Sequence, residues 1–169
     1  MWAVLIVVCV TVLGGWYGWP AEQGREAVVR QQAAANAETV GMYRQAVVAW
    51  FKVHDVTGTS VSLADLKQAG VLPAWSNLAT SATAAAWTNY RDSAGRIYIF
   101  PAAAAGASAG APPIVAELVA LSRNSLNVGI YRASDHTLWS PVDGTRIALP
   151  PLGGTVIPDA APVWLASCD

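Results

Sequence analysis

The sequence predicts an α+β fold in which an N-terminal transmembrane helix continues into an amphipathic helix and then into a small antiparallel β-sheet domain. Residues 1–19 carry no charged side chain, residues 21–54 are rich in Ala, Glu, Gln and Arg, and strand-like segments gather in the second half of the chain. Helices followed by antiparallel strands are typical of α+β domains. We therefore divide the 169 residues into an anchor (1–20), an amphipathic helix or stalk (21–54) and an α+β domain (55–169).

The anchor has the length and the composition of a membrane span. The first charged side chain is Glu22, and a helix of about 19 residues rises about 28 Å, close to the roughly 30 Å of hydrocarbon in a bilayer. Aromatic rings stand at both ends, as expected at the two interfaces. The span could end in a kink near Pro20. The residues expected to hold this segment in lipid are Trp2, Leu5, Ile6, Val10, Leu13, Trp16, Tyr17 and Trp19.

A removable signal peptide is the alternative interpretation of the same residues. Such a peptide has a basic start and small residues before its cleavage site. Here no Lys or Arg precedes the apolar run, and bulky rings occupy its exit. We therefore expect an uncleaved anchor in a bacterial inner membrane, with the bulk of the chain in the periplasm. Arg25 and Arg30 argue mildly against export of the C-terminal side, a signal that a long following domain can override.

The amphipathic helix should bury one face of its second half. Apolar and aromatic side chains recur there at the spacing of one helical face: Val40, Tyr43, Val47, Trp50, Phe51 and His54. Gly24 and Gly41 each allow a break. A short second helix is predicted after Ser62, which is followed at the third position by Asp65 in the pattern of an N-cap, and it should stop at Gly70 before Pro73.

The rest of the chain alternates strand-like segments with turn residues. Residues 87–90 and 97–100 predict a β-hairpin, and Pro113 suits the first turn of a short helix that carries Ile114, Leu118 and Leu121. Residues 76–86 are interpreted as loop, and the Ala/Gly/Ser-rich residues 102–112 as a low-complexity loop. Further strands are predicted at 128–132, 137–139, 146–149 and 163–166.

Composition excludes several classes of function. The net charge of -1 offers no basic stripe for nucleic acid. Cys9 and Cys168 cannot form a disulfide framework, and with His54 and His136 they provide no zinc ligand set by spacing. No phosphate-binding loop, dinucleotide fingerprint or nucleophile elbow is present. We therefore predict no metal, no cofactor and no nucleic-acid partner.

The strongest catalytic candidate is the pair Asp135-His136, which would serve an anchored hydrolase together with a serine. Adjacent residues rarely orient each other as a triad requires, so the segment from Ser134 to His136 is interpreted as a hairpin turn. His54 is interpreted as a structural residue near a helix C-terminus. Asp55 and Asp65 do not form a convincing carboxylate pair, because one ends a helix and the other starts the next. The sequence predicts no enzyme.

Tryptophan is abundant, with eight in the chain. Those after the anchor are Trp50, Trp75, Trp87, Trp139 and Trp164. We expect most of them to lie in the core with the indole N–H paired. Because aromatic side chains are also enriched at interfaces, Trp75 and Trp139 are candidate contacts to a partner protein.

Several of these segments resemble the PilM family of the thin, type IVb-like pilus systems. The resemblance rests on the hydrophobic N-terminus, on Tyr43-Arg44-Gln45-Ala46 with Trp50, on the run from Leu66 to Pro73 with its Leu-x-x-x-Gly-x-Leu-Pro pattern, and on the β-rich end. It implies an inner-membrane protein with a periplasmic domain that serves the pilin transport apparatus or the pilus base. The implied partners are other pilus assembly proteins: the pilin, the inner-membrane platform and the secretin. An actin-like nucleotide binder that shares the name PilM differs in length and in its phosphate-binding glycines.

The layout is also similar to a type IV pilin, in which an apolar helix runs into an amphipathic half and an antiparallel sheet. A prepilin has a basic leader and a Glu five positions into its mature helix, whereas no acid precedes Glu22 here. A membrane-anchored assembly component is therefore the first hypothesis, a minor pilin-like subunit of the fibre the second, and an anchored periplasmic hydrolase the third. Homo-oligomer formation stays open.

Overall fold

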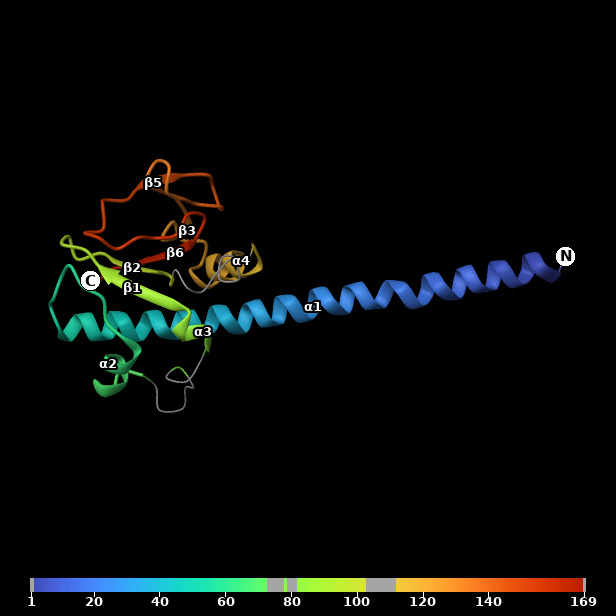
Figure 1. The fold of residues 1–169 in the computed structure, drawn as a ribbon, viewed down its shortest axis with the longest axis horizontal. Helices are drawn as coiled ribbons and strands as arrows, with labels where there is room; N and C mark the ends of the chain where they lie inside the picture. Colours follow the sequence, from blue (N-terminus) through green and yellow to red (C-terminus); the bar gives the residue numbers. More distant parts are fainter. Residues whose placement is uncertain (1, 73–77, 79–81, 103–111, 169) are drawn as a thin grey trace.

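The computed structural model describes the backbone of residues 2–72, 78, 82–102 and 112–168. It describes the side chains of residues 25–72, 78, 82–102 and 113–168. It confirms an α+β chain (Figure 1). Its elements are α1 (Trp2–Val53), α2 (Leu63–Gln68), α3 (Ala82–Ala85), β1 (Trp87–Arg91), β2 (Ile97–Pro101), α4 (Pro112–Leu121), β3 (Val128–Arg132), β4 (Thr137–Trp139), β5 (Arg146–Ala148) and β6 (Pro162–Ala166).

The long helix α1 is continuous through both glycines at which a break was allowed, and through Pro20. Its first half stands away from the domain as an isolated rod, and its second half lies against the sheet (Figure 1). The predicted stripe is buried at Val40, Tyr43, Val47 and Phe51. Trp50 is only half-buried and His54 is exposed.

Local signals place α2 where the sequence predicts it. The Ser62 hydroxyl accepts a hydrogen bond from the Asp65 backbone N–H at 3.1 Å, and the Asp65 carboxylate accepts one from the Ser62 N–H at 3.3 Å. This reciprocal capping box satisfies two N–H groups that the first helical turn leaves unpaired. Gly70 ends the segment with a φ of +67°, a conformation that favours glycine. In contrast, the interpretation of residues 76–86 as loop is wrong at α3, a single helical turn beside α1.

The sheet has six antiparallel strands in the order β1-β2-β6-β3-β4-β5. The predicted hairpin β1–β2 and the meander β3–β4–β5 are local units, and the C-terminal strand β6 joins them by pairing with β2 on one side and β3 on the other. Trp164 lies at this junction, opposite Ile99 on β2 and Val128 on β3. The C-terminal strand β6 therefore closes the domain by joining the hairpin to the meander.

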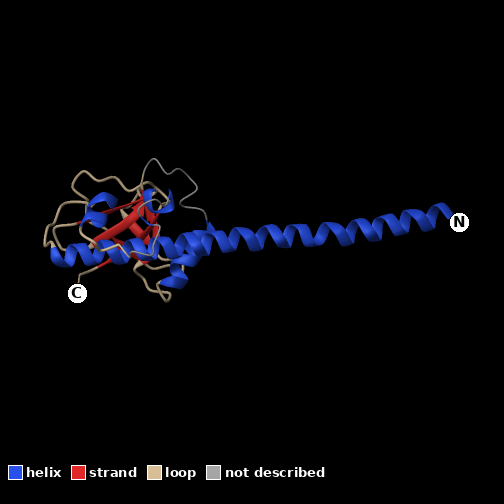
Figure 2. Ribbon diagram, turned by 90° about the horizontal axis from the view of Figure 1, so that it is seen from below, coloured by secondary structure: helices blue, strands red, loops and turns tan. Residues whose placement is uncertain are grey.

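Each face of the sheet carries its own core. Helices α1 and α4 cover one face (Figure 2), where the buried side chains include Ile97, Ile99 and Trp164. The other face is covered by the loop of residues 149–161. Alternate residues of β2 enter the two cores, since Tyr98 and Phe100 face this loop. Burial on both faces explains why residues 97–100 form a continuous apolar run.

Gly129 on β3 tolerates no side chain. A Cβ at this position would lie 2.6 Å from the Trp139 carbonyl oxygen and 2.8 Å from Leu138 Cγ on the neighbouring strand. The first neighbour is backbone and cannot rotate away, so we expect Gly129→Ala to lower the free energy of unfolding by about 2–3 kcal/mol. Gly41→Ala is the control in chemical denaturation, because its Cβ meets just one atom, Trp164 Cη2, in ordinary contact at 4.0 Å. Equal stability of the two variants would contradict the expected clash.

Candidate interaction surfaces

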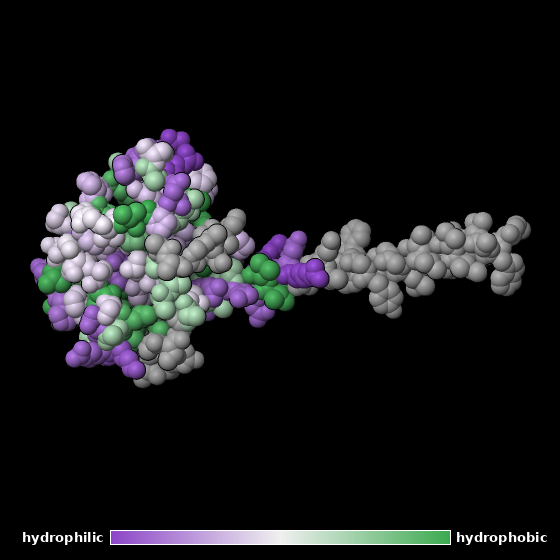
Figure 3. All heavy atoms as spheres, in the orientation of Figure 1, coloured by the Kyte–Doolittle hydropathy of each residue, from purple (hydrophilic) through white to green (hydrophobic). Residues whose placement is uncertain are grey.

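The predicted anchor residues lie in the first half of α1 as far as the backbone is concerned. Their side chains, from Trp2 to Trp19, lie outside the described residues. Among the residues whose side chains the structure describes, no helix combines the length and the apolar character of a membrane span. The exposed part of α1 next to the domain carries Val28 and Val29 at 62 % and 52 % exposure, visible as apolar surface between polar groups (Figure 3).

Of the two tryptophans predicted to contact a partner, Trp75 lies outside the described residues. Trp139 is half-buried on β4, where the Arg132 guanidinium lies over its ring at 5.5 Å from the centroid. Its contact with a partner stays a prediction. Trp87 and Trp164 are buried in the helix-side core, which confirms the core interpretation for these two.

An apolar hollow lies between α4, the strand β3 and the segment that follows β4. This α4 groove encloses about 540 Å³ and is lined by Val115, Ala116, Val119, Asn124, Ile130, Pro141 and Val142. Val142 at its rim is 47 % exposed. A surface of this kind fits apolar side chains of a protein partner better than a charged or hydrophilic ligand.

Asp135 and His136 each contact a different side chain and do not pair with each other as a catalytic triad requires. The Asp135 carboxylate accepts a hydrogen bond from Thr137 Oγ1 at 2.9 Å and pairs with Arg146 at 3.7 Å. The pKa of Asp135 is lowered chiefly by that Thr137 hydrogen bond. His136 Nδ1 instead lies 2.9 Å from the Tyr131 hydroxyl. The segment is the β3–β4 turn, with His136 at a φ of +50°, as predicted.

The remaining titratable candidates have structural partners. His54 Nδ1 lies 3.0 Å from the Trp50 carbonyl oxygen, and its ring stacks on the Trp50 indole at 4.2 Å. Asp55 pairs with Arg91 at 2.9 Å, whereas Asp65 caps α2, so the two acids do not form a carboxylate pair. Across the described residues, no group of three or more His, Cys, Asp or Glu could hold a metal ion.

A buried polar junction was missed by the sequence reasoning. Asn89, 1 % exposed on β1, accepts a hydrogen bond from the Val61 N–H at 3.0 Å. Its amide nitrogen donates to the Val61 carbonyl at 2.8 Å and to the Tyr43 hydroxyl at 2.6 Å. Burial raises the pKa of Tyr43 to about 12, opposed by the Asn89 hydrogen bond. Asn89 thus joins the long helix, the segment before α2 and the edge of the sheet.

The two runs that carry the family resemblance pack on the same core. Tyr43 from the first run makes the hydrogen bond with Asn89, and Ala46 is buried behind it. Leu66 from the second run is fully buried, and Gly70 ends its helix. Arg44 lies at the margin of this core, with its guanidinium over the Trp164 ring.

Comparison with known proteins gives one assignment. The family model named PilM matches residues 8–165, which include α1 from residue 8 onward, both runs and the six strands except the last residue of β6. No curated protein and no solved structure matches the chain at a significant level. The chain therefore belongs to the PilM family, and its function is related to the pilus.

Proposed function

We propose that this protein is a component of a type IV pilus assembly or pilin transport apparatus that acts by protein–protein contact and not by catalysis. We place it at the bacterial inner membrane, with the domain in the periplasm. The family match over residues 8–165 is the observation that carries this proposal, because it connects the chain to pilus assembly partners in general. The pilin, the inner-membrane platform and the secretin are the partners we propose.

The sequence of residues 1–20 supports the membrane attachment, since it is apolar throughout and has aromatic residues at both ends. The part of α1 that lies between the anchor and the domain would hold the domain at a distance from the bilayer (Figure 1). Fusion of alkaline phosphatase to the C-terminus tests this topology. We expect an active fusion in the membrane fraction, and an inactive fusion or a freely soluble protein would refute it.

The α4 groove is the surface we propose for contact with an assembly partner. Its rim residue Val142 is exposed, so replacement by Glu places a charge in the groove without disturbing the core. We expect Val142→Glu to reduce the number of surface pili at least tenfold, at unchanged protein level. Val156→Glu is the matched control, because Val156 is 80 % exposed and lies outside the groove. Equal piliation in the two strains would remove the groove from the proposal.

A minor pilin-like subunit is the second candidate function. The long helix that runs into an antiparallel sheet favours it. A subunit of the fibre is recovered in sheared pili, whereas an assembly component stays in the membrane fraction. Immunoblots of both fractions separate the two functions.

An anchored hydrolase is the third candidate function. Such an enzyme would require His136, so normal pilus assembly in a His136→Ala strain leaves that idea without support.

A further inference from the structure

Arg44 is a half-buried cation that has no ion-pair or hydrogen-bond partner among the described residues. Its guanidinium carbon lies 5.1 Å from the centroid of the Trp164 ring, and its Nε is fully covered yet meets no hydrogen-bond acceptor in the described part of the chain. None of the ion pairs among the described residues includes it. Burial lowers the pKa of Arg44, but an arginine stays charged at physiological pH. Within the part of the chain that the structure describes, this partly desolvated positive charge therefore has neither an ion pair nor a hydrogen bond.

Arg91 differs from Arg44 in that its guanidinium has hydrogen-bond partners. Its Nε is also covered and unpaired, but its two terminal nitrogens bind the Asp55 carboxylate at 2.9 Å and the Val56 carbonyl at 3.1 Å. Among the described residues, Arg44 has neither a carboxylate nor a carbonyl oxygen as a partner. A Leu or Met would cover Trp164 equally well without the cost of desolvating a charge. The charge of Arg44 therefore points to a ligand from outside the described residues.

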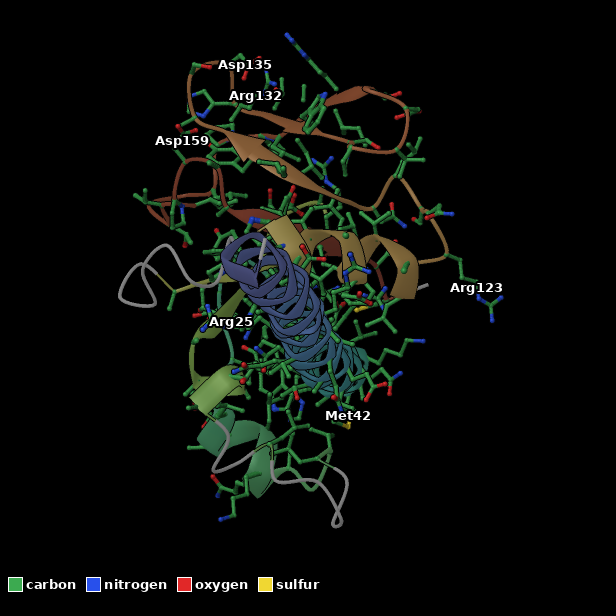
Figure 4. The ribbon with its side chains drawn as sticks, turned by 90° about the vertical axis from the view of Figure 1, so that its right-hand side faces the viewer. Arg25, Met42, Arg123, Arg132, Asp135 and Asp159 are labelled. Atoms are coloured by element: carbon green, nitrogen blue, oxygen red, sulfur yellow. The ribbon has the colours of Figure 1, made fainter. Side chains whose placement is uncertain are left out.

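The space beside Arg44 is large enough for such a ligand. A pocket of about 410 Å³ is lined by Glu38, Gly41, Met42, Arg44, Gln45, Leu121 and Trp164. In Figure 4, Met42 lies below the long helix, and Arg123 projects to the right, beyond the end of α4. The walls at Met42, Leu121 and Trp164 are apolar, and Gly41 leaves the floor open. The volume exceeds that of a carboxylate alone, so it also fits the apolar part of a peptide.

We propose that this Arg44 pocket receives an Asp or Glu side chain that a partner protein presents next to an apolar residue. A carboxylate matches the planar donor edge of a guanidinium in two parallel hydrogen bonds, while the Trp164 ring keeps the cation in place. Glu38 also lines the pocket, and its negative charge disfavours an incoming carboxylate everywhere except directly beside the Arg44 guanidinium. That the partner is a pilus assembly protein rests on the proposed function, but the chemistry of the pocket does not.

Nuclear magnetic resonance on the full-length chain in detergent micelles tests the pocket without reference to pili. The probes are the amides of N-acetyl-leucyl-glutamate and of N-acetyl-leucyl-glutamine, added at millimolar concentrations. We expect the Glu peptide, and not the Gln peptide, to shift the Arg44 Nε–H and the Trp164 indole resonances. The Arg44→Met variant should lose the response of Trp164, and Gly41→Met, which fills the floor, should weaken it. Gly41→Ala is the control that keeps it. Equal shifts with both peptides, or none with either, would overturn the proposal.

Genetics in piliated cells identifies the source of the carboxylate. We expect Arg44→Glu to reduce piliation at least tenfold and Arg44→Lys to reduce it less, with both proteins folded by circular dichroism. Suppressors that restore pili should change an Asp or Glu of another pilus protein to Lys or Arg. Suppressors confined to this chain would show a contact within it or between two copies, which would overturn the partner assignment. Loss of the gene without loss of pili would instead refute the proposed function, and the peptide experiment would still decide the pocket.

Discussion

Replacing Asn89 by Leu is expected to lower the free energy of unfolding by about 3–5 kcal/mol. The amide makes three hydrogen bonds in a site that is 1 % exposed, and the substitution would leave the Val61 N–H, the Val61 carbonyl and the Tyr43 hydroxyl unpaired. Each buried polar group without a partner costs about 1–3 kcal/mol. A domain of this size is stable by roughly 5–15 kcal/mol in total, so the loss is a large part of the whole.

Urea denaturation of the full-length protein followed by near-ultraviolet circular dichroism measures this effect. Tyr43→Phe removes just one of the three bonds and should cost about 1 kcal/mol. Thr88→Val on the same strand is the control, because the Thr88 hydroxyl makes no hydrogen bond in the described part of the chain. If Asn89→Leu is as stable as Thr88→Val, the junction does not support the fold as described.

The elements of this fold that the sequence predicts are those set by local interactions. The capping pattern from Ser62 to Asp65 places α2, and the apolar spacing from Val40 to Phe51 places the buried face of α1. The hairpin of β1 and β2 follows from two strand-like segments around a short turn. Each of these features depends on residues that are close to each other in the sequence, so a single sequence contains the necessary information.

The pairings that close the domain were beyond such reasoning. β6 lies between β2 and β3, and its pairing with residues more than thirty positions away depends on which arrangement buries most apolar surface. The predicted strand at residues 87–90 includes Asn89 without a special role and ends one residue before Arg91, which is the last residue of β1. The position of Asn89 between Trp87 and Tyr90 in a predicted strand was the signal that could have identified it. In the sequence, Arg44 stands out only as part of the segment that resembles the PilM family. Its lack of an acidic partner among the described residues becomes apparent in the folded structure, where it lies over Trp164.

The second large effect is expected at Asp92, which organises the turn between β1 and β2. This carboxylate is 5 % exposed and accepts hydrogen bonds from the Tyr98 hydroxyl at 2.8 Å, from the N–H groups of Ala94 and Arg96 at 2.9 Å, and from Arg96 Nε at 3.2 Å. Asp92→Ala leaves the hydroxyl of the fully buried Tyr98 unpaired and releases the turn, so we expect a loss of about 3–4 kcal/mol. Asp159→Ala, at an exposed acid that accepts one backbone N–H, should cost less than half as much.

The pH dependence of stability provides an independent check on the same residue. Desolvation raises the pKa of Asp92, but the Tyr98 hydroxyl and the Arg96 N–H groups outweigh it, and the net pKa lies below its ordinary value. The folded state therefore binds this proton less readily than the unfolded state, whose carboxyl titrates near about 3.9. The charge stabilises the fold above that pH, and the contribution is lost as the pH falls through the folded-state pKa.

Asp92→Asn keeps an acceptor for the turn but has no charge to lose. The stability difference between the wild-type protein and Asp92→Asn should be constant near neutral pH and shrink below about pH 4. A difference that persists unchanged in acid would mean that the carboxylate charge contributes nothing.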